Sequence, residues 1–247
     1  TPSAPTATTA LQVEELRCWH NLGDTLWSPR WLKAVDGVSF QVQAGESLGV
    51  VGGSGCGKST LCRALMGLSP IRGGQVWLQG VNLLQQRGAR KRLLRRSIQM
   101  VFQDPLACLN PAMCVSDAIA DPLLIHGLRS KTAARERARE LLELVGLSPA
   151  EQFQNRRPRQ LSGGQQQRVA IARALALEPK VLICDESVSM LDAEIQADVL
   201  NLLRTLQHRL GLAMVFVTHD LSVASGFCHQ VIVLDHGRIV EQGPGDQ

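Results

Sequence analysis

The chain has 247 residues, 45% of them apolar, and a formal net charge of +4. It is long enough to bury one large core, and no internal repeat or long linker indicates a second one. Residues 1–10 have neither the basic start nor the apolar core of a signal peptide, so we expect a disordered lead-in before a single domain over residues 11–247. The longest apolar runs have the length of strands, too short to span a bilayer.

The seven cysteines form no CxxC pair and no His/Cys metal spacing, which predicts reduced thiols in a cytoplasmic protein. Cys184 stands in an apolar run and is expected in the core. One basic cluster is conspicuous, consisting of Arg87, Arg90, Lys91, Arg92, Arg95 and Arg96. The cluster is typical of a solvated helix face, and contact with acidic headgroups or nucleic acid is the alternative.

In chain order, residues 34–51 predict two strands separated by a turn at 44–46, and residues 59–67 predict a helix. Further strands are expected at 75–78 and 98–102. Strand, glycine loop and helix in this order are the usual context of a phosphate-binding site.

Residues 104–160 differ, because apolar residues recur there at helical spacing, as in Ala133–Val145, which predicts an inserted helical unit. Alternation then resumes. We expect helices at 164–177, 193–210 and 221–227 and strands at 181–184, 213–218 and 231–234. Nearly continuous apolar strands that alternate with helices indicate a parallel sheet covered on both faces.

A glycine-rich segment fits the GxxxxGK[ST] pattern of ATP-binding loops: Gly52, Gly53, Ser54, Gly55, Cys56, Gly57, Lys58, Ser59 and Thr60. Glycines let the backbone aim its N–H groups at phosphate oxygens, and the following helix adds its positive N-terminal end. Lys58 is expected to bridge the β- and γ-phosphates, and the Ser59 hydroxyl to bind Mg²⁺. The alternative, a chance glycine turn, fits poorly between a strand and a helix.

The predicted strand at 181–184 ends in two carboxylates. Asp185 is expected to hold Mg²⁺, directly or through water, and Glu186 to polarise the attacking water as general base. Apolar strands with acidic ends are common, so the assignment depends on the phosphate loop upstream.

A second phosphate-handling segment comprises Leu161, Ser162, Gly163, Gly164 and Gln165. It begins a predicted helix and offers free N–H groups and a hydroxyl to an anion. Ser162 can also simply cap that helix, and both roles can hold together. The pentapeptide LSGGQ is the signature of the ATP-binding cassette (ABC) superfamily, in which it closes over the ATP held by the glycine loop of a different subunit.

Together these motifs resemble ABC ATPases from about Leu11 to Gly243. The resemblance implies an α/β fold: an ABC-type phosphate-loop NTPase core with a mostly parallel sheet, an antiparallel β subdomain and a helical subdomain inserted at about 104–160. It also implies that His219 contacts the γ-phosphate and orients Glu186 and the water. Gln103 would touch Mg²⁺ and relay the nucleotide state to the helical insert, and Asp192 would belong to the loop that couples two sites across a dimer.

Within the superfamily the chain looks most like the ATPase subunits of oligopeptide, dipeptide and nickel importers. The resemblance rests on residues 32–39, on FQDP at 102–105 with LNP at 109–111, and on residues 183–186 with 188–189. It implies an enzyme that converts ATP and water to ADP and phosphate, with Mg²⁺, and drives uptake of peptides or a related solute such as nickel. The implied partners are a second ATPase subunit, identical or paralogous, two integral membrane permease subunits and, indirectly, an extracytoplasmic solute-binding protein. The implied place is the cytoplasmic face of the inner membrane, with no nucleic-acid partner.

The chain departs from the family at several positions. The family usually stacks an aromatic residue, often Tyr, on adenine, but this chain has no Tyr, and Trp19 is assigned that role, with His20 as the alternative. Ser187 replaces the usual Pro and Met190 the usual Ala. The chain also stops soon after Gly243, where peptide-importer members usually continue, which predicts a trimmed copy or a shorter variant.

Two other functions share the core motifs. An exporter or lipid-extraction ATPase is disfavoured by the FQDP and LNP segments. A soluble ABC ATPase of DNA repair or translation usually carries a long coiled-coil or zinc insertion, or two cassettes in one chain. Here the gap between the glycine loop and the signature holds only a short helical insert, and no zinc spacing appears.

Overall fold

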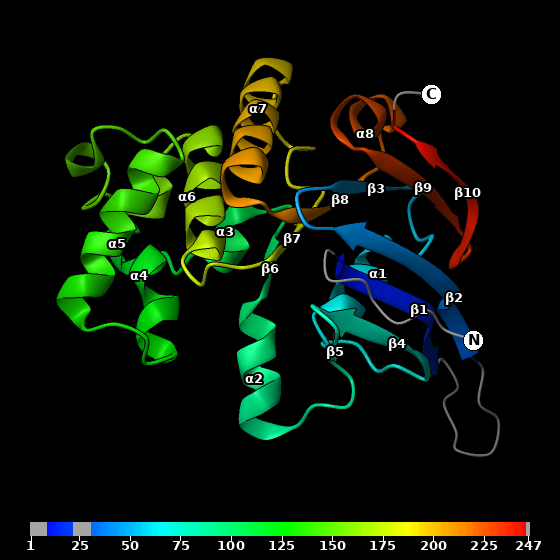
Figure 1. Ribbon diagram of the computed structural model, residues 1–247. Helices are drawn as coiled ribbons and strands as arrows, with labels where there is room; N and C mark the ends of the chain where they lie inside the picture. The colour runs from blue at the N-terminus through cyan, green and yellow to red at the C-terminus, as the bar shows by residue number, and fades with distance from the viewer. Residues whose placement is uncertain (1–8, 22–30, 246–247) are drawn as a thin grey trace.

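The computed structural model describes residues 9–21 and 31–245, and Figure 1 shows two sheets beside a group of helices. The first sheet has four strands in the order β2-β1-β4-β5 and is antiparallel. Its strands are β1 (Thr9–Asn21), β2 (Trp31–Gln43), β4 (Gly73–Leu78) and β5 (Val81–Asn82). This sheet is the antiparallel β subdomain that the family resemblance implies.

Strand β1 begins earlier than the sequence suggests. Thr9 and Ala10, placed in the expected lead-in, are buried and form its first two residues, and Thr9 pairs with Gln43 of β2. The lead-in boundary is therefore corrected, because pairing with β2 orders a segment whose composition alone favours disorder. Residues 1–8 lie outside the described part of the chain.

The second sheet has six strands in the order β10-β9-β3-β8-β7-β6. Its strands are β3 (Ser47–Val51), β6 (Ile98–Val101), β7 (Val181–Asp185), β8 (Ala213–Thr218), β9 (Gln230–Asp235) and β10 (Arg238–Pro244). All neighbours are parallel except β10, which runs antiparallel to β9. The carboxyl ends of the five parallel strands therefore meet at one edge of the sheet, where open α/β sheets bind ligands.

Apolar side chains fill both faces of the parallel sheet. Along β8, Met214 and Phe216 belong to one buried cluster, whereas Val215 and Val217 belong to the other. A strand buried on both faces needs apolar residues at every position, which explains its continuous apolar sequence. Cys184 is also fully buried, as predicted, and burial raises the pKa of its thiol to about 12. All seven cysteines are free thiols.

Some helices pack around the sheets, and α4 and α5 belong to a separate helical subdomain, which in Figure 1 lies beyond α6 and α7. The helices are α1 (Lys58–Leu65), α2 (Gly88–Arg96), α3 (Pro105–Cys108), α4 (Val115–Ile125), α5 (Lys131–Leu144), α6 (Gly163–Leu175), α7 (Ala193–Leu210) and α8 (Leu221–Phe227), with 3-10 helices at Ala150–Gln152 and Pro158–Gln160. The predicted helices at 193–210 and 221–227 have the observed bounds. The basic cluster extends from Arg87, which precedes α2, through that helix, which has no buried residue, and most of the cluster faces solvent, whereas Arg95 donates to the carbonyl oxygen of Gly67 at 2.6 Å. Across residues 9–21 and 31–245, none of the helices is both long and apolar enough to cross a membrane.

Helices α6 and α7 approach closely at Gly164. A Cβ atom added there would lie 2.6 Å from Cγ2 of Ile195, nearer than real carbon contacts allow. A Cβ added at Gly163 would instead lie 3.7 Å from Cδ2 of Leu191, which is ordinary contact. The two adjacent glycines of the signature therefore differ in their structural role, because packing against α7 requires a glycine only at position 164.

We predict that Gly164→Ala lowers the free energy of unfolding by about 1–3 kcal/mol, the usual cost of overpacking, and that Gly163→Ala costs clearly less. Urea denaturation of the two variants measures the difference. Ile195→Ala should offset part of the Gly164→Ala cost, because it removes the clashing methyl group. Equal stability of the two glycine variants would contradict this account of the contact.

Candidate active site

The phosphate loop connects β3 to α1 and has a backbone that only glycine adopts easily. Gly55 and Gly57 have φ angles of 79° and 113°. A Cβ atom at Gly57 would overlap the carbonyl oxygen of Ala34, and one at Gly52 would overlap the carbonyl oxygen of Leu234. The pattern of glycines is thus required by conformation and by close contact with neighbouring strands.

Lys58 is held over this loop. Its Nζ atom donates hydrogen bonds to the carbonyl oxygens of Gly52 at 2.7 Å and Gly53 at 2.9 Å. The side chain is only 7% exposed and lies 3.9 Å from Oε1 of Glu186. A buried ammonium with satisfied donors is already positioned for phosphate oxygens, which leaves little side-chain entropy to lose on binding.

Asp185 and Ser59 form the candidate cation site. Atom Oδ1 of Asp185 is buried without a hydrogen-bond partner among the described residues. Burial, and next the Glu186 carboxylate, raise the pKa of Asp185. The positive charges of Arg63 and Lys58 and a hydrogen bond from Ser59 oppose this rise. An unpartnered carboxylate oxygen beside a hydroxyl is the hard oxygen donor set that Mg²⁺ prefers, so these residues fit that ion.

Glu186 follows β7 in a strained conformation. Its φ angle is 46°, in the left-handed region that non-glycine residues rarely adopt, and its N–H donates to the carbonyl oxygen of Val217. Strained backbones of this kind are concentrated at functional sites. Atom Oε2 lies 3.9 Å from Nδ1 of His219, whose side chain is 63% exposed after β8. Glu186 thus lies between Lys58 and His219, as a base acting next to the γ-phosphate would.

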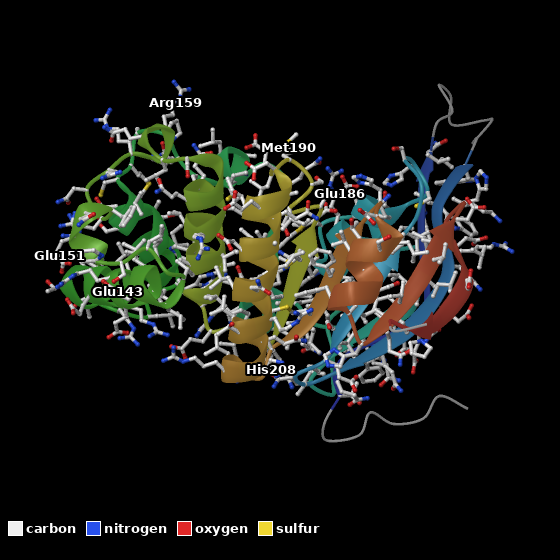
Figure 2. All side chains as sticks on the ribbon, turned by 90° about the horizontal axis from the view of Figure 1, so that it is seen from above. Glu143, Glu151, Arg159, Glu186, Met190 and His208 are labelled. Carbon is white, nitrogen blue, oxygen red and sulfur yellow. The ribbon has the colours of Figure 1, made fainter. Side chains whose placement is uncertain are left out.

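Gln103 and Asp192 lie on loops that meet near Glu186. The amide of Gln103, after β6, is 3.5 Å from Oγ of Ser189, and that hydroxyl donates to the carbonyl oxygen of Glu186 at 2.9 Å. Asp192 caps α7 by accepting from the N–H of Ile195 at 3.0 Å. Figure 2 shows Glu186 and Met190 at the same end of the central layer, with His208 at the opposite end of α7.

The signature residues Ser162 and Gln165 form a reciprocal capping box at the start of α6. The N–H of Gln165 donates to Oγ of Ser162 at 3.3 Å, and the N–H of Ser162 donates to Oε1 of Gln165 at 3.1 Å. Ser162 and Gly163 are exposed at the helix start, whereas the flanking Leu161 and Gly164 are buried. The capping role of Ser162 is therefore present, and the positive helix end remains open for an anion.

A cavity of about 390 Å³ joins most of the predicted phosphate-binding residues. Its described lining consists of His20, Leu32, Ala34, Ser54, Gly55, Gly57, Lys58, Ser59, Thr60 and Glu186. Ser162–Gln165 and Asp192 are not part of this lining. The chain thus brings the phosphate loop and the base together, and it places the signature elsewhere.

Trp19 does not line this cavity, so the structure corrects its assignment as the adenine contact. Successive side chains of a strand point to opposite faces, and here His20 enters the cavity while Trp19 faces away. The indole Nε1 of Trp19 lies 3.3 Å from Oδ1 of Asp36, and Nζ of Lys33 lies 4.9 Å from the ring centroid. His20, which the sequence offered only as the alternative, is therefore the better candidate.

Sequence reasoning also missed Leu32, Arg63 and the linking role of Ser189. Arg63 comes four residues after Ser59 on α1, and this helical spacing could have placed it on the same face as Ser59, the side that acts on Asp185. Leu32 enters the cavity only through the pairing of His20 with Leu32 across β1 and β2. No local sequence signal reveals that pairing.

A glycine loop between a strand and a helix, a buried lysine and two carboxylates at the end of another parallel strand, β7, define a nucleoside-triphosphate hydrolase of the phosphate-loop class. The family model described as "ABC transporter" matches residues 35–189. The chain belongs to this family, and it is an ATP-binding ATPase.

Similar proteins support this placement along nearly the whole chain. The oligopeptide transport ATP-binding protein OppF of Escherichia coli is 46% identical over 242 residues, 96% of this chain and 72% of that protein. The OppF of Salmonella typhimurium is 49% identical over 89% of this chain and 65% of its own length, and the dipeptide transport ATP-binding protein DppF of Escherichia coli is 44% identical over 96% and 71%. The chain thus spans about two thirds to three quarters of these relatives.

Solved structures show the same fold. A dimeric, post-hydrolysis structure of the ATP-binding cassette MJ0796 with ADP and Pi superimposes with a TM-score of 0.82 at 31% identity, covering 95% of this chain and 98% of that one. The cbiO1 protein of Clostridium perfringens, part of a cbiONQ ABC transporter complex, gives 0.82 at 30% identity, covering 97% and 90%. The predicted fold class and ATPase activity are confirmed.

We predict that Glu186→Gln lowers ATP turnover by roughly 10²–10⁴-fold, because the amide cannot accept the water proton, while ATP still binds. Phosphate release and a nucleotide-binding titration measure the two effects separately. Glu241→Gln, an exposed carboxylate of β10, is the matched control and should retain turnover. Near-normal turnover of Glu186→Gln would disprove the assignment of the base.

Lys58→Ala should abolish tight nucleotide binding, because it removes the buried ammonium from the loop carbonyls and from the phosphate oxygens. Isothermal titration with ATP measures the affinity. Unchanged ATP affinity would show that the loop does not hold the phosphates.

Proposed function

We propose that this chain is the ATP-hydrolysing subunit of an importer that takes up peptides or a related solute such as nickel. The observation that carries the proposal is its identity of 44–49% to oligopeptide and dipeptide transport ATP-binding proteins, over 89–96% of the chain. ATP binding and hydrolysis in a subunit dimer would be coupled to movement of separate membrane subunits. We infer the import direction and the solute class from the transport functions in the names of such relatives.

The placement of the signature supports a composite ATP site. The cavity beside Lys58 contains no residue of Ser162–Gln165 among its described lining, yet the start of α6 is open for an anion. A second subunit, identical or paralogous, would bring its own Ser162 to the nucleotide held by this chain. Met190, within the coupling loop that contains Asp192, is 70% exposed and would contribute to that interface.

Within the closed site each residue has a definite task. The loop N–H groups and Lys58 would bind the β- and γ-phosphate oxygens. Ser59 and Asp185, with Gln103, would hold Mg²⁺, which when bound neutralises negative charge on the phosphate oxygens. Glu186 would accept the proton of the attacking water at a carboxylate oxygen, and His219 would orient Glu186. Positioning and charge stabilisation therefore replace covalent catalysis.

The membrane partners would dock beside Gln103. Phe102 and Leu106, which flank it, are both more than one third exposed although apolar. Exposed apolar residues next to a nucleotide sensor suit contact with two permease subunits. An extracytoplasmic solute-binding protein would act through those permeases, and the chain would lie at the cytoplasmic face of the inner membrane.

We predict that a strain lacking this chain loses uptake of labelled oligopeptides, and that the wild-type chain restores it. Glu186→Gln should fail to restore uptake although the protein accumulates, whereas Glu241→Gln should restore it. Loss of efflux with normal uptake would favour an exporter. ATPase stimulation by nucleic acid, with transport unaffected, would favour a soluble ABC ATPase.

A further inference from the structure

The phosphate loop is supported from behind by the turn between β9 and β10. The N–H of Gly237 in this turn donates to the carbonyl oxygen of Cys56 in the loop at 2.9 Å. The N–H of Asp36 on β2 donates to the carbonyl oxygen of Gly237 at 2.8 Å. Two backbone hydrogen bonds therefore connect β2, the turn and the phosphate loop in series.

This support determines which way one loop peptide faces. The peptide between Cys56 and Gly57 is trans, since the only cis peptide in the described residues is Ser148–Pro149. In a planar trans peptide the carbonyl and the N–H point in opposite directions. Because the carbonyl of Cys56 points to Gly237, the N–H of Gly57 points away from the turn, and Gly57 lines the phosphate cavity.

The turn and the phosphate loop both pack closely against β2. Gly237 has a φ angle of 79°, and a Cβ added there would lie 2.7 Å from the carbonyl oxygen of Lys33. At Gly57, an added Cβ would overlap the carbonyl oxygen of Ala34 and lie 3.6 Å from Cα of Gly237. Because the turn and the loop contact the same strand and each other, we expect a displacement of the turn to shift the loop.

An ion pair fastens the turn to β2. Nη2 of Arg238, the residue after Gly237, donates to Oδ2 of Asp36 at 2.7 Å. Nζ of Lys33 lies 3.7 Å from the same oxygen, and the indole Nε1 of Trp19 donates to Oδ1 at 3.3 Å. The Asp36 side chain is only 9% exposed. The hydrogen bond from Arg238 lowers the pKa of Asp36 although burial opposes the shift, and the charge of Lys33 lowers it further.

We propose that Asp36 and Arg238 are positioning residues of the ATP site: their ion pair holds the β9–β10 turn, and the turn orients the N–H of Gly57 toward the nucleotide phosphates. Trp19 thereby has a role as a donor to Asp36, on the face opposite to the nucleotide cavity. The inference rests on ATP binding by the phosphate loop and not on the proposed transport.

The arrangement predicts a specific kinetic effect. A loop N–H that binds a phosphate oxygen acts on bound ATP and on the transition state alike, so its loss removes uniform binding. Uniform binding appears in KM, whereas kcat is unaffected. A variant that disturbed the fold generally would instead lower kcat through loss of active protein.

The test compares Arg238→Gln with Arg238→Lys and with Arg17→Gln in steady-state ATPase assays. Arg17 is the matched control, because it lines the same outer face and lies opposite Asp36 across β1 and β2, but its guanidinium pairs with Glu15 at 3.0 Å and forms no side-chain hydrogen bond or ion pair with Asp36 among the described interactions. Arg238→Gln should raise the KM for ATP about three- to tenfold and change kcat by less than about twofold. Arg238→Lys should retain most of the affinity, and Arg17→Gln should match the wild type.

Two further measurements test the positioning role of Asp36 and Arg238 independently of the steady-state comparison. ATP affinity in the Glu186→Gln background should fall by the same factor on adding Arg238→Gln. If Arg238→Gln does not fold at the assay temperature, Trp19→Phe, which removes the indole donor and keeps an aromatic ring beside Lys33, should raise the KM in the same direction by a smaller factor. Equal KM values for Arg238→Gln and Arg17→Gln, or a fall in kcat with KM unchanged, would overturn the proposal. No membrane subunit takes part, so a failure of the transport proposal leaves these results intact.

Discussion

The active site depends on backbone contacts between the phosphate loop and the strands around it. Gly52 and Gly57 lie so close to carbonyl oxygens of Leu234 and Ala34 that a side chain at either position would overlap them. The loop is therefore fixed before nucleotide arrives, and Lys58 is held above it by two of its own carbonyl groups. Preorganised donors of this kind stabilise phosphate charge without reorganisation during the reaction. The Asp36–Arg238 ion pair extends the same rigidity to the outer face of the protein.

The parallel sheet explains why most of the phosphate-handling groups converge and why the signature does not join them. The phosphate loop, Glu186 and His219 follow β3, β7 and β8, whose carboxyl ends meet at one edge. The signature begins α6, outside the cavity of its own chain. In the proposed dimer, a chain with this geometry would hold one half of each of two ATP sites, and closure of two subunits over ATP would link hydrolysis to movement.

The sequence predicts best those features that are local in the chain. Motif residues that directly follow an apolar strand, such as Asp185 and Glu186, have their places determined by the strand itself. Trp19 was misassigned as the adenine contact because β1 has register shifts, one of them between Cys18 and Trp19. A register shift changes which face of the sheet a side chain lies on, so the face cannot be inferred by counting residues along the sequence. The bond from Gly237 to Cys56 joins residues that are far apart in the chain, and no pattern near either one indicates it.

The most direct test is the solution mass of the Glu186→Gln protein, measured by light scattering with and without Mg-ATP. The account predicts that ATP doubles the mass, because two copies close over nucleotide that cannot be hydrolysed. Adding Ser162→Phe, which blocks the open start of α6, should prevent the doubling while ATP still binds. A protein saturated with ATP that keeps its monomer mass, or a doubling that is indifferent to Ser162, would contradict closure of two copies through the signature.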